Sequence, residues 1–143
     1  MKAARLIVSE KTGRWAVALR RELAGSSVRI QQTRSLPECI EELTARRGSL
    51  LALEATWTNL AKVLDVLGQM QRRFPLARAV VLADRSLDNT KWLLREAGAL
   101  HVTCSPRLLA PVARLAQRHL TAAPQEQLPV TERMMASLPW SRV

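Results

Sequence analysis

Cysteine is scarce in this chain of 143 residues, since only Cys39 and Cys104 occur. Two cysteines cannot build the disulfide framework of a small secreted domain. Long apolar runs are absent too, and none approaches the roughly 18–20 residues that a membrane-spanning helix needs. The apolar run near the N-terminus is interrupted at Ser9, Glu10 and Lys11, too early for the apolar core of a secretory signal. These absences predict a cytoplasmic protein with no part in a membrane.

Glycine and aromatic residues are also rare. The chain has 5 glycines, and none falls in the G-x-G-x-x-G or Walker spacing that cradles phosphate groups. Its aromatic residues are one Phe and four Trp, with no Tyr. Stacking platforms for single-stranded nucleic acid are difficult to build from so few rings. The sequence gives no indication of a cofactor, and we expect none.

Charge, in contrast, is plentiful and mostly of one sign. There are 22 basic residues against 12 acidic ones, a net charge of +10. Such an excess suits nucleic acid or an acidic protein partner. No run of five or more basic residues occurs, however, and Arg greatly outnumbers Lys, as high genomic GC content alone would produce. Nucleic-acid binding is therefore an alternative interpretation and not the favoured one.

Apolar residues follow two spacings that alternate along the chain. Strand-like runs cover residues 4–9, 27–33, 49–54, 78–83 and 100–104, and helical spacing covers 12–25, 35–48, 58–74, 87–98 and 108–120. This alternation, with short connections, predicts a parallel sheet covered by helices on both faces. In the second strand-like run, apolar and polar residues alternate, as expected of a strand at the edge of a sheet. In the third and fourth runs, the residues on both sides of the strand are apolar, as expected of buried strands. The pattern favours a single doubly wound, flavodoxin-like α/β domain with strand order 2-1-3-4-5.

Some residues mark where the predicted helices begin. Thr12 is a candidate N-cap for the first helix. Ser35 is the predicted N-cap of the second, and Pro37 falls in its first turn.

After the last predicted helix the sequence contains three prolines and little helical periodicity. We expect one α/β domain over 1–121 and a proline-containing tail over 122–143, either flexible or packed as a short helix. The tail carries an apolar group that could pack on this domain or on a partner: Met134, Met135, Leu138 and Trp140.

Four of the predicted strands end at one edge of the sheet, where ligands and reacting groups gather in open α/β domains. The residues at these ends are Ser9, Glu10, Glu54, Ala83, Asp84 and Ser105. Over residues 4–121 the chain resembles the receiver domain of bacterial two-component response regulators. The resemblance rests on the order and spacing of four runs: RLIVSE, SLLALE, RFPLARAVVLA and EAGALHVTCSP.

The resemblance implies an ancestral phosphorylation site. Receivers phosphorylate themselves on an Asp that closes the third strand, beside an acidic pair that helps to hold Mg²⁺. A Ser or Thr at the end of the fourth strand and a Lys before the Pro of the fifth contact the phosphoryl group. Here Glu54 stands at the acceptor position and Ser9 and Glu10 at the acidic pair. Ala83 stands at the hydroxyl position and Ser105 at the lysine position.

These substitutions remove most of the chemistry of phosphoryl transfer. The longer Glu54 moves its carboxylate by about 1 Å from the position of attack. Ser9 weakens the Mg²⁺ site, Ala83 has no hydroxyl, and Ser105 supplies no cation. Only Glu10 retains a side chain suited to its family role. We therefore expect a degenerate receiver with no catalytic residues, no metal site and no enzymatic activity.

Glu54 itself has two interpretations. Its carboxylate could imitate a phosphorylated Asp and hold one conformation, or it could be a strand-end acid that is either solvated or paired with a cation such as Lys11 or Arg85. Trp57, on the following loop, could fold over the sheet edge and fill the space that Mg²⁺ and water occupy in a working receiver.

The histidines and cysteines do not predict a metal site. His101 and Cys104 belong on opposite faces of one strand, and Cys39 is on another element. Trp15 and Trp92 lie near apolar helical stripes, which favours core packing for both.

A basic face around the helices predicted at 87–98 and 108–120 is the candidate interaction surface, because receivers usually dimerise and signal through these elements. It comprises Lys91, Trp92, Arg95, Arg107, Arg114 and Arg118. Arginines beside a Trp are good anchors for an acidic partner, although a merely solvated face would look the same. We predict a non-phosphorylatable regulatory or adaptor module of signal transduction that binds a protein and could form a homodimer through these helices. The alternative is a nucleic-acid-associated basic protein.

Overall fold

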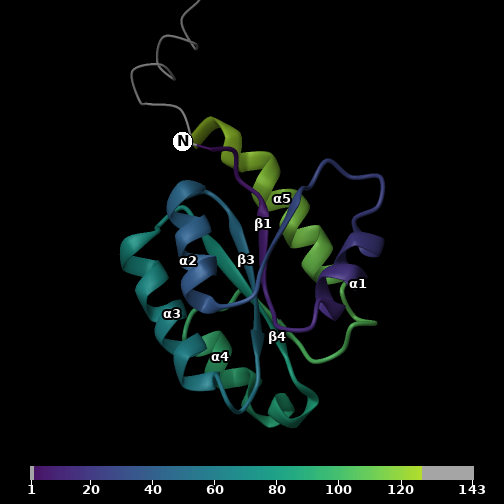
Figure 1. The fold of residues 1–143 in the computed structure, drawn as a ribbon, viewed down its shortest axis with the longest axis vertical. Coiled ribbons are helices and arrows are strands. Elements are labelled where there is room, and N and C mark those ends of the chain that lie inside the picture. The colour runs from purple at the N-terminus through teal and green to yellow at the C-terminus, as the bar shows by residue number, and fades with distance from the viewer. Residues whose placement is uncertain (1, 127–143) are drawn as a thin grey trace, which may run out of the picture.

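The computed structural model describes residues 2–126 of the chain. Its strands are β1 (Leu6–Ser9), β2 (Ile30–Thr33), β3 (Leu50–Ala55), β4 (Arg78–Ala83) and β5 (His101–Thr103). Its helices are α1 (Arg14–Glu22), α2 (Leu36–Ala45), α3 (Leu60–Arg73), the 3₁₀ helix η1 (Arg85–Thr90), α4 (Lys91–Glu96) and α5 (Ala110–Glu126). The strands of this described part form one parallel sheet in the order β2-β1-β3-β4-β5 (Figure 1). The predicted fold class and strand order are confirmed.

The sheet is covered on both faces. In Figure 1, α1 and α5 lie on one side of it, and α2, α3 and α4 lie on the other. Successive residues of a strand point to opposite faces. In β1, Ile7 therefore joins the core under α2, α3 and α4, whereas Leu6 and Val8 join the core under α1 and α5. No helix between residues 2 and 126 is long and apolar enough to cross a membrane.

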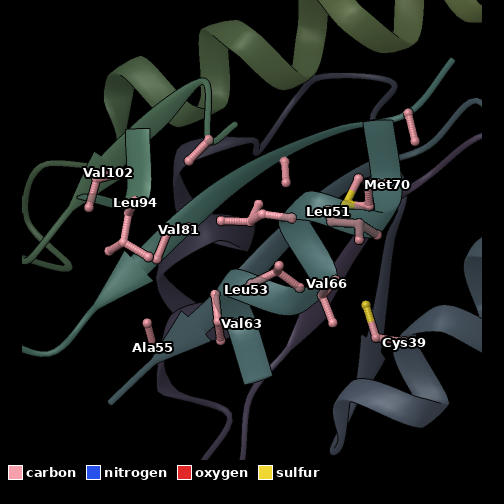
Figure 2. Packing of buried hydrophobic residues seen from close by; sticks show 14 of the residues in the cluster. Cys39, Leu51, Leu53, Ala55, Val63, Val66, Met70, Val81, Leu94 and Val102 are labelled. Atoms are coloured by element: carbon pink, nitrogen blue, oxygen red, sulfur yellow. The ribbon is translucent and has the colours of Figure 1, made fainter. Parts of the chain in front are cut away.

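The larger core lies between the sheet and α2, α3 and α4. Figure 2 shows Leu51 and Leu53 of β3 gathered with Val63 and Met70 of α3 and with Cys39 of α2. All five side chains are buried. Fully burying one Leu, Val or Met side chain contributes about 1.5–3 kcal/mol, so this layer stabilises the packing of α2 and α3 on the central strands.

The start of α1 differs from its prediction. Thr12 makes no cap, and the N-cap position belongs to Gly13, whose φ of 86° favours glycine. The prediction for α2 is confirmed: Ser35 Oγ accepts the N–H of Glu38 at 3.2 Å, and Pro37 lies in the first turn. The cap of α1 comes from farther back in the chain, as described below.

Two later elements also differ from the sequence pattern. The segment predicted as one helix over 87–98 is split into η1 and the shorter α4. Asp84 begins η1, where Oδ1 accepts the N–H of Arg85 at 2.9 Å. The final helix is predicted to end at residue 120 but continues to Glu126. The tail residues Met134, Met135, Leu138 and Trp140 lie outside the described residues.

Candidate functional site

The carboxyl ends of β1 and β3 meet at one edge of the sheet, as they must in a parallel arrangement. Residues Ser9 and Leu53 are partners in the register of these two strands. A cavity of about 200 Å³ opens there, and Ser9, Glu10 and Glu54 all line it. Three of the five residues that the resemblance assigns to a receiver site therefore line one cavity.

Glu10 is tied to the first turn of α1. Its side chain is buried, and its Oε1 accepts the N–H of Trp15 at 2.9 Å. Its Oε2 accepts the N–H of Ala16 at 2.6 Å. The first amides of a helix lack partners within it, and a carboxylate there also interacts favourably with the helix dipole. Since Gly13 offers no side chain, Glu10 replaces the missing cap, a role that its position three residues before Gly13 did not suggest.

Glu54 is held more loosely. It is half-buried, and its Oε1 accepts the backbone N–H of Lys11 at 3.3 Å. The expected link to Lys11 thus exists, but it runs through the main chain. Within residues 2–126 the ion pairs involve other acids, so no pairing of Glu54 with Arg85 is formed. The loop after Glu54 is fixed by Asn59, whose Nδ2 donates to the Glu54 carbonyl at 2.9 Å.

The surroundings of these two acids are cationic. Lys11, Arg34 and Lys62 line the same cavity. Mg²⁺ requires several hard oxygen ligands in near-octahedral geometry. Both oxygens of Glu10 already accept amides, and one oxygen of Glu54 does so too. In the part of the chain that the structure describes, no three His, Cys, Asp or Glu side chains are grouped as metal ligands. The residues present do not fit the Mg²⁺ of a receiver site.

The other two receiver positions do not join this cavity. Ala83 is fully buried at the end of β4 and belongs to the apolar core. Ser105 lines a different cleft, on the far side of β5. Its Oγ accepts the N–H of Arg107 at 3.2 Å and so shapes the turn into α5. Neither residue therefore lines the cavity that Ser9, Glu10 and Glu54 share.

The tryptophans divide into one buried and two exposed residues within the described range. Trp15 is 0% exposed and packs in the core under α1 and α5, as predicted. Trp92 is 64% exposed, so its predicted place in the core is wrong: it follows Lys91 at the start of the short α4 and faces outward. Trp57 is 60% exposed and does not line the cavity at the β1 and β3 ends. It does not fill the space of the receiver site.

A second and larger cleft lies between η1 and α4 on one side, β5 at its base, and the start of α5 on the other. Its volume is about 720 Å³. Its charged and polar lining includes Arg85, Asp88, Lys91, Arg95, His101, Cys104, Ser105 and Arg107. Three residues of the predicted interaction face are in this lining, whereas Trp92, Arg114 and Arg118 lie on the helix surfaces outside it.

Ionisable groups in this cleft are shifted from their ordinary behaviour. Lys91 Nζ lies 2.8 Å from Asp88 Oδ1. This contact lowers the pKa of Asp88 and raises the pKa of Lys91. Partial burial, followed by the charges of Arg95 and Lys91, lowers the pKa of His101. Burial is also the main cause that raises the pKa of the Cys104 thiol.

Arg85, Asp88 and His101 line this cleft but are not part of the interaction face predicted from the sequence. Asp88 and Lys91 are three apart, the spacing of an ion pair on one helical face, and this was an available signal. The approach of Arg85 to β5 had no such signal, because it depends on how η1 folds over the edge of the sheet.

Comparisons with known proteins give matches among solved structures alone. No protein-family model and no curated protein matches the sequence. A response regulator from Thermotoga maritima superimposes with a TM-score of 0.67 and 13% identity, over 83% of this chain and 99% of that chain. A CheY-like protein (tadZ) from Pseudomonas aeruginosa gives 0.61 and 17%, over 90% and 98%. A putative pilus assembly protein (cpaE) from Burkholderia thailandensis gives 0.53 and 20%, over 80% and 98%.

Identities this low establish similarity of fold and nothing finer. The sheet order β2-β1-β3-β4-β5 with helices on both faces agrees with that similarity. The chain therefore has the fold of CheY-like receiver domains.

Proposed function

We propose that this chain is a receiver-like regulatory or adaptor module that works by binding a protein partner and is not phosphorylated. A shared fold does not by itself establish a function, so the proposal rests on the residues at the sheet edge. It is a proposal for a binding protein, without catalytic residues.

The observation that carries the proposal is the state of Glu10. A working receiver needs its acidic pair free to ligate a metal ion, but here both oxygens of Glu10 accept helix amides, at 2.9 Å from Trp15 and 2.6 Å from Ala16. Ser9 cannot replace the second acid. Around them, Lys11 and Lys62 bring positive charge where a divalent cation would have to sit. These features favour a structural use of the former site.

The basic face of α4 and α5 supports the choice of partner. Trp92 is 64% exposed, and Arg114 and Arg118 are exposed on α5. Exposed Trp and Arg side chains are the types that most often anchor protein interfaces, and guanidinium groups suit an acidic surface. One structural neighbour, the putative pilus assembly protein (cpaE) from Burkholderia thailandensis, supports a role within an assembly.

Phosphoryl chemistry is tested directly with Mg²⁺ and beryllofluoride, a phosphoryl mimic. Tryptophan fluorescence is followed for the wild type and for Glu54→Asp. We expect no saturable change in the wild type. A saturable, Mg²⁺-dependent change in the wild type would overturn the proposal. A response in Glu54→Asp alone would show that the site is silenced by Glu54 and would leave the wild type unphosphorylated.

Partner binding is tested by affinity capture with matched variants. Trp92→Ala combined with Arg114→Glu changes the proposed face, and Trp57→Ala combined with Arg72→Glu makes the same chemical changes elsewhere, at exposed positions. We expect the first pair to abolish capture of one defined acidic partner and the second pair to preserve it. Equal loss in both pairs would contradict a face on α4 and α5. Size-exclusion chromatography of the same variants tests whether the partner is a second copy of this chain.

Nucleic-acid binding remains the second candidate because of the net charge of +10. Generic double-stranded DNA serves as the probe, titrated at several salt concentrations. Binding through phosphate contacts would weaken steeply with salt, since each neutralised phosphate releases counterions. We expect weak binding only; tight binding with a steep salt dependence would favour this second candidate over the first.

A further inference from the structure

The cleft between α4, β5 and α5 has the size and lining of a small-molecule site. Its volume of about 720 Å³ lies inside the range of roughly 300–1,000 Å³ that ligand pockets occupy. Its apolar lining comes from β5 and the start of α5, where Val102, Leu108 and Pro111 contribute. Charged side chains are contributed from both flanks. An apolar base with a few convergent polar groups is the usual composition of a binding site.

Of the four cationic side chains among the described residues of the cleft, three fall into two groups along β5, and the fourth, Lys91, is paired with Asp88. Arg85 follows the end of β4 and Arg107 follows the end of β5, and both line the cleft. Because these strands are parallel, their ends lie at the same edge of the sheet. Arg95 lies in the last turn of α4, and the chain then returns to the start of β5 at His101, which places these two residues toward the opposite end.

The positive charge of the cleft is largely uncompensated. Asp88 is the one acid among the described lining residues, and its Oδ1 lies 2.8 Å from Lys91 Nζ. Within residues 2–126 neither Arg85, Arg95 nor Arg107 takes part in an ion pair. Guanidinium groups bind phosphate through paired N–H donors. The end that holds Arg85 and Arg107 is therefore suited to a phosphate group.

The base of the cleft adds main-chain groups of an edge strand. Leu100 N–H donates to the Ala79 carbonyl at 2.8 Å, toward β4. Main-chain groups alternate in direction along a strand, so those of His101 and Thr103 face away from β4, toward the open edge. β5 is the last strand of the sheet. These groups can hydrogen bond a polar ring placed against the strand.

We propose that this cleft binds a nucleoside diphosphate or a similar phosphorylated molecule of nucleotide size. Arg85 and Arg107 hold the phosphates, and the ring lies between Arg95 and His101 over the apolar base. A guanidinium group can stack on a heteroaromatic ring. The lowered pKa of His101 leaves its imidazole neutral at neutral pH, where it can both donate and accept a hydrogen bond. The site needs no glycine-rich loop and does not depend on the proposed function.

The test is isothermal titration calorimetry of the full chain with ADP and with GDP, in low-salt buffer. Inorganic pyrophosphate and the nucleosides adenosine and guanosine are the probes of the separate parts. We expect at least one of the two nucleotides to bind with micromolar affinity and to bind at least about tenfold more tightly than pyrophosphate or its own nucleoside. Failure of both nucleotides to bind at millimolar concentration overturns the proposal. Pyrophosphate binding as tightly as the nucleotides also overturns it, because the site would then take an adventitious ion only.

Variants of matched charge separate the cleft from the general basic surface. Arg85→Gln with Arg107→Gln removes two charges from the cleft, and Arg114→Gln with Arg118→Gln removes two exposed charges from α5. We expect the first pair to weaken nucleotide binding by about tenfold or more and the second by less than about twofold. Equal weakening by both pairs overturns the proposal. Circular dichroism and thermal unfolding confirm that each pair is folded.

Asp88→Asn should have the opposite effect on nucleotide affinity. It removes the one negative charge of the described lining and releases Lys91 from its ion pair. Nucleotide binding should tighten by roughly threefold or more. A weakening would contradict the proposed electrostatics. If an acidic protein segment occupied the cleft instead, ADP and GDP would not displace the captured partner. The partner-capture experiment would still succeed in that case. The two proposals can therefore fail separately.

Discussion

The N–H of Ala16 donates to Oε2 of Glu10 across 2.6 Å, and this contact joins the end of β1 to the first turn of α1. The neighbouring N–H of Trp15 donates to the other oxygen of the same carboxylate. The residue that the receiver resemblance assigns to a metal ion thus acts as a helix cap. Substitution of Glu10 should therefore lower the stability of the folded protein, even where no ligand is present.

Glu10→Gln should lower the free energy of unfolding by about 1–2 kcal/mol, because a neutral amide retains one acceptor and loses the charge-assisted bond. Chemical denaturation measures the change. Glu54→Gln is the control, since Glu54 is half-buried and accepts one hydrogen bond of 3.3 Å. Its effect should stay below about 0.5 kcal/mol. Equal effects of the two substitutions would contradict the capping role.

Gly98 and Gly68 should respond to alanine in opposite directions. Gly98 has a φ of +123°, and a Cβ there would lie 2.7 Å from Gln71 Nε2. Gly98→Ala should therefore cost about 1–2 kcal/mol. Gly68 lies in α3 with nothing within 4 Å of an added Cβ, so Gly68→Ala should stabilise by about 0.5–1 kcal/mol. Thermal unfolding of the two variants checks both signs, and a stabilising Gly98→Ala would refute the turn geometry.

The two thiols should differ in reactivity. Cys39 is 0% exposed, and burial raises its pKa to about 12. Cys104 is half-buried at the cleft. Because the thiolate is the reactive form, a disulfide reagent should modify Cys104 in the folded protein, faster as the pH rises, and Cys39 only on unfolding. Cys104→Ser should then show no reaction in the folded state. Rapid labelling of Cys39 in that variant would mean that the core opens locally.

His101 should titrate below the ordinary histidine value of 6.5, because burial and then Arg95 and Lys91 disfavour its charged form. As the pH falls, His101 is therefore protonated at a higher pH in the unfolded chain than in the folded one. The contribution of His101 to stability is therefore present above 6.5 and is lost as the pH falls through the lower folded value. Arg95→Gln should raise the His101 pKa toward 6.5, whereas Arg72→Gln on α3 should not change it. Proton NMR of the ring follows the titration, and a wild-type pKa at or above 6.5 would contradict the arrangement.

Much of the fold could be predicted from local patterns. β4 was expected at the residues where it occurs, because its apolar run is buried on both faces. The cap of α2 could also be predicted, since Ser35 and Pro37 act within a single turn. The break between η1 and α4 could not, because the helical spacing of residues 87–98 is continuous and Asp84 redirects the chain just before it.

Residue order alone was sufficient to predict the α/β architecture and the strand order, and to place Glu54, Ala83 and Ser105 where the receiver resemblance expects an acceptor, a hydroxyl and a lysine. These depend on residue identity and on periodicity, which act over a few neighbouring residues. Tertiary structure alone decided that Glu10 caps α1, that Trp92 faces outward, and that Ser105 lies in a different cleft from Glu54. Each of these outcomes depends on how separate elements pack across the sheet edges, and no local pattern encodes that packing.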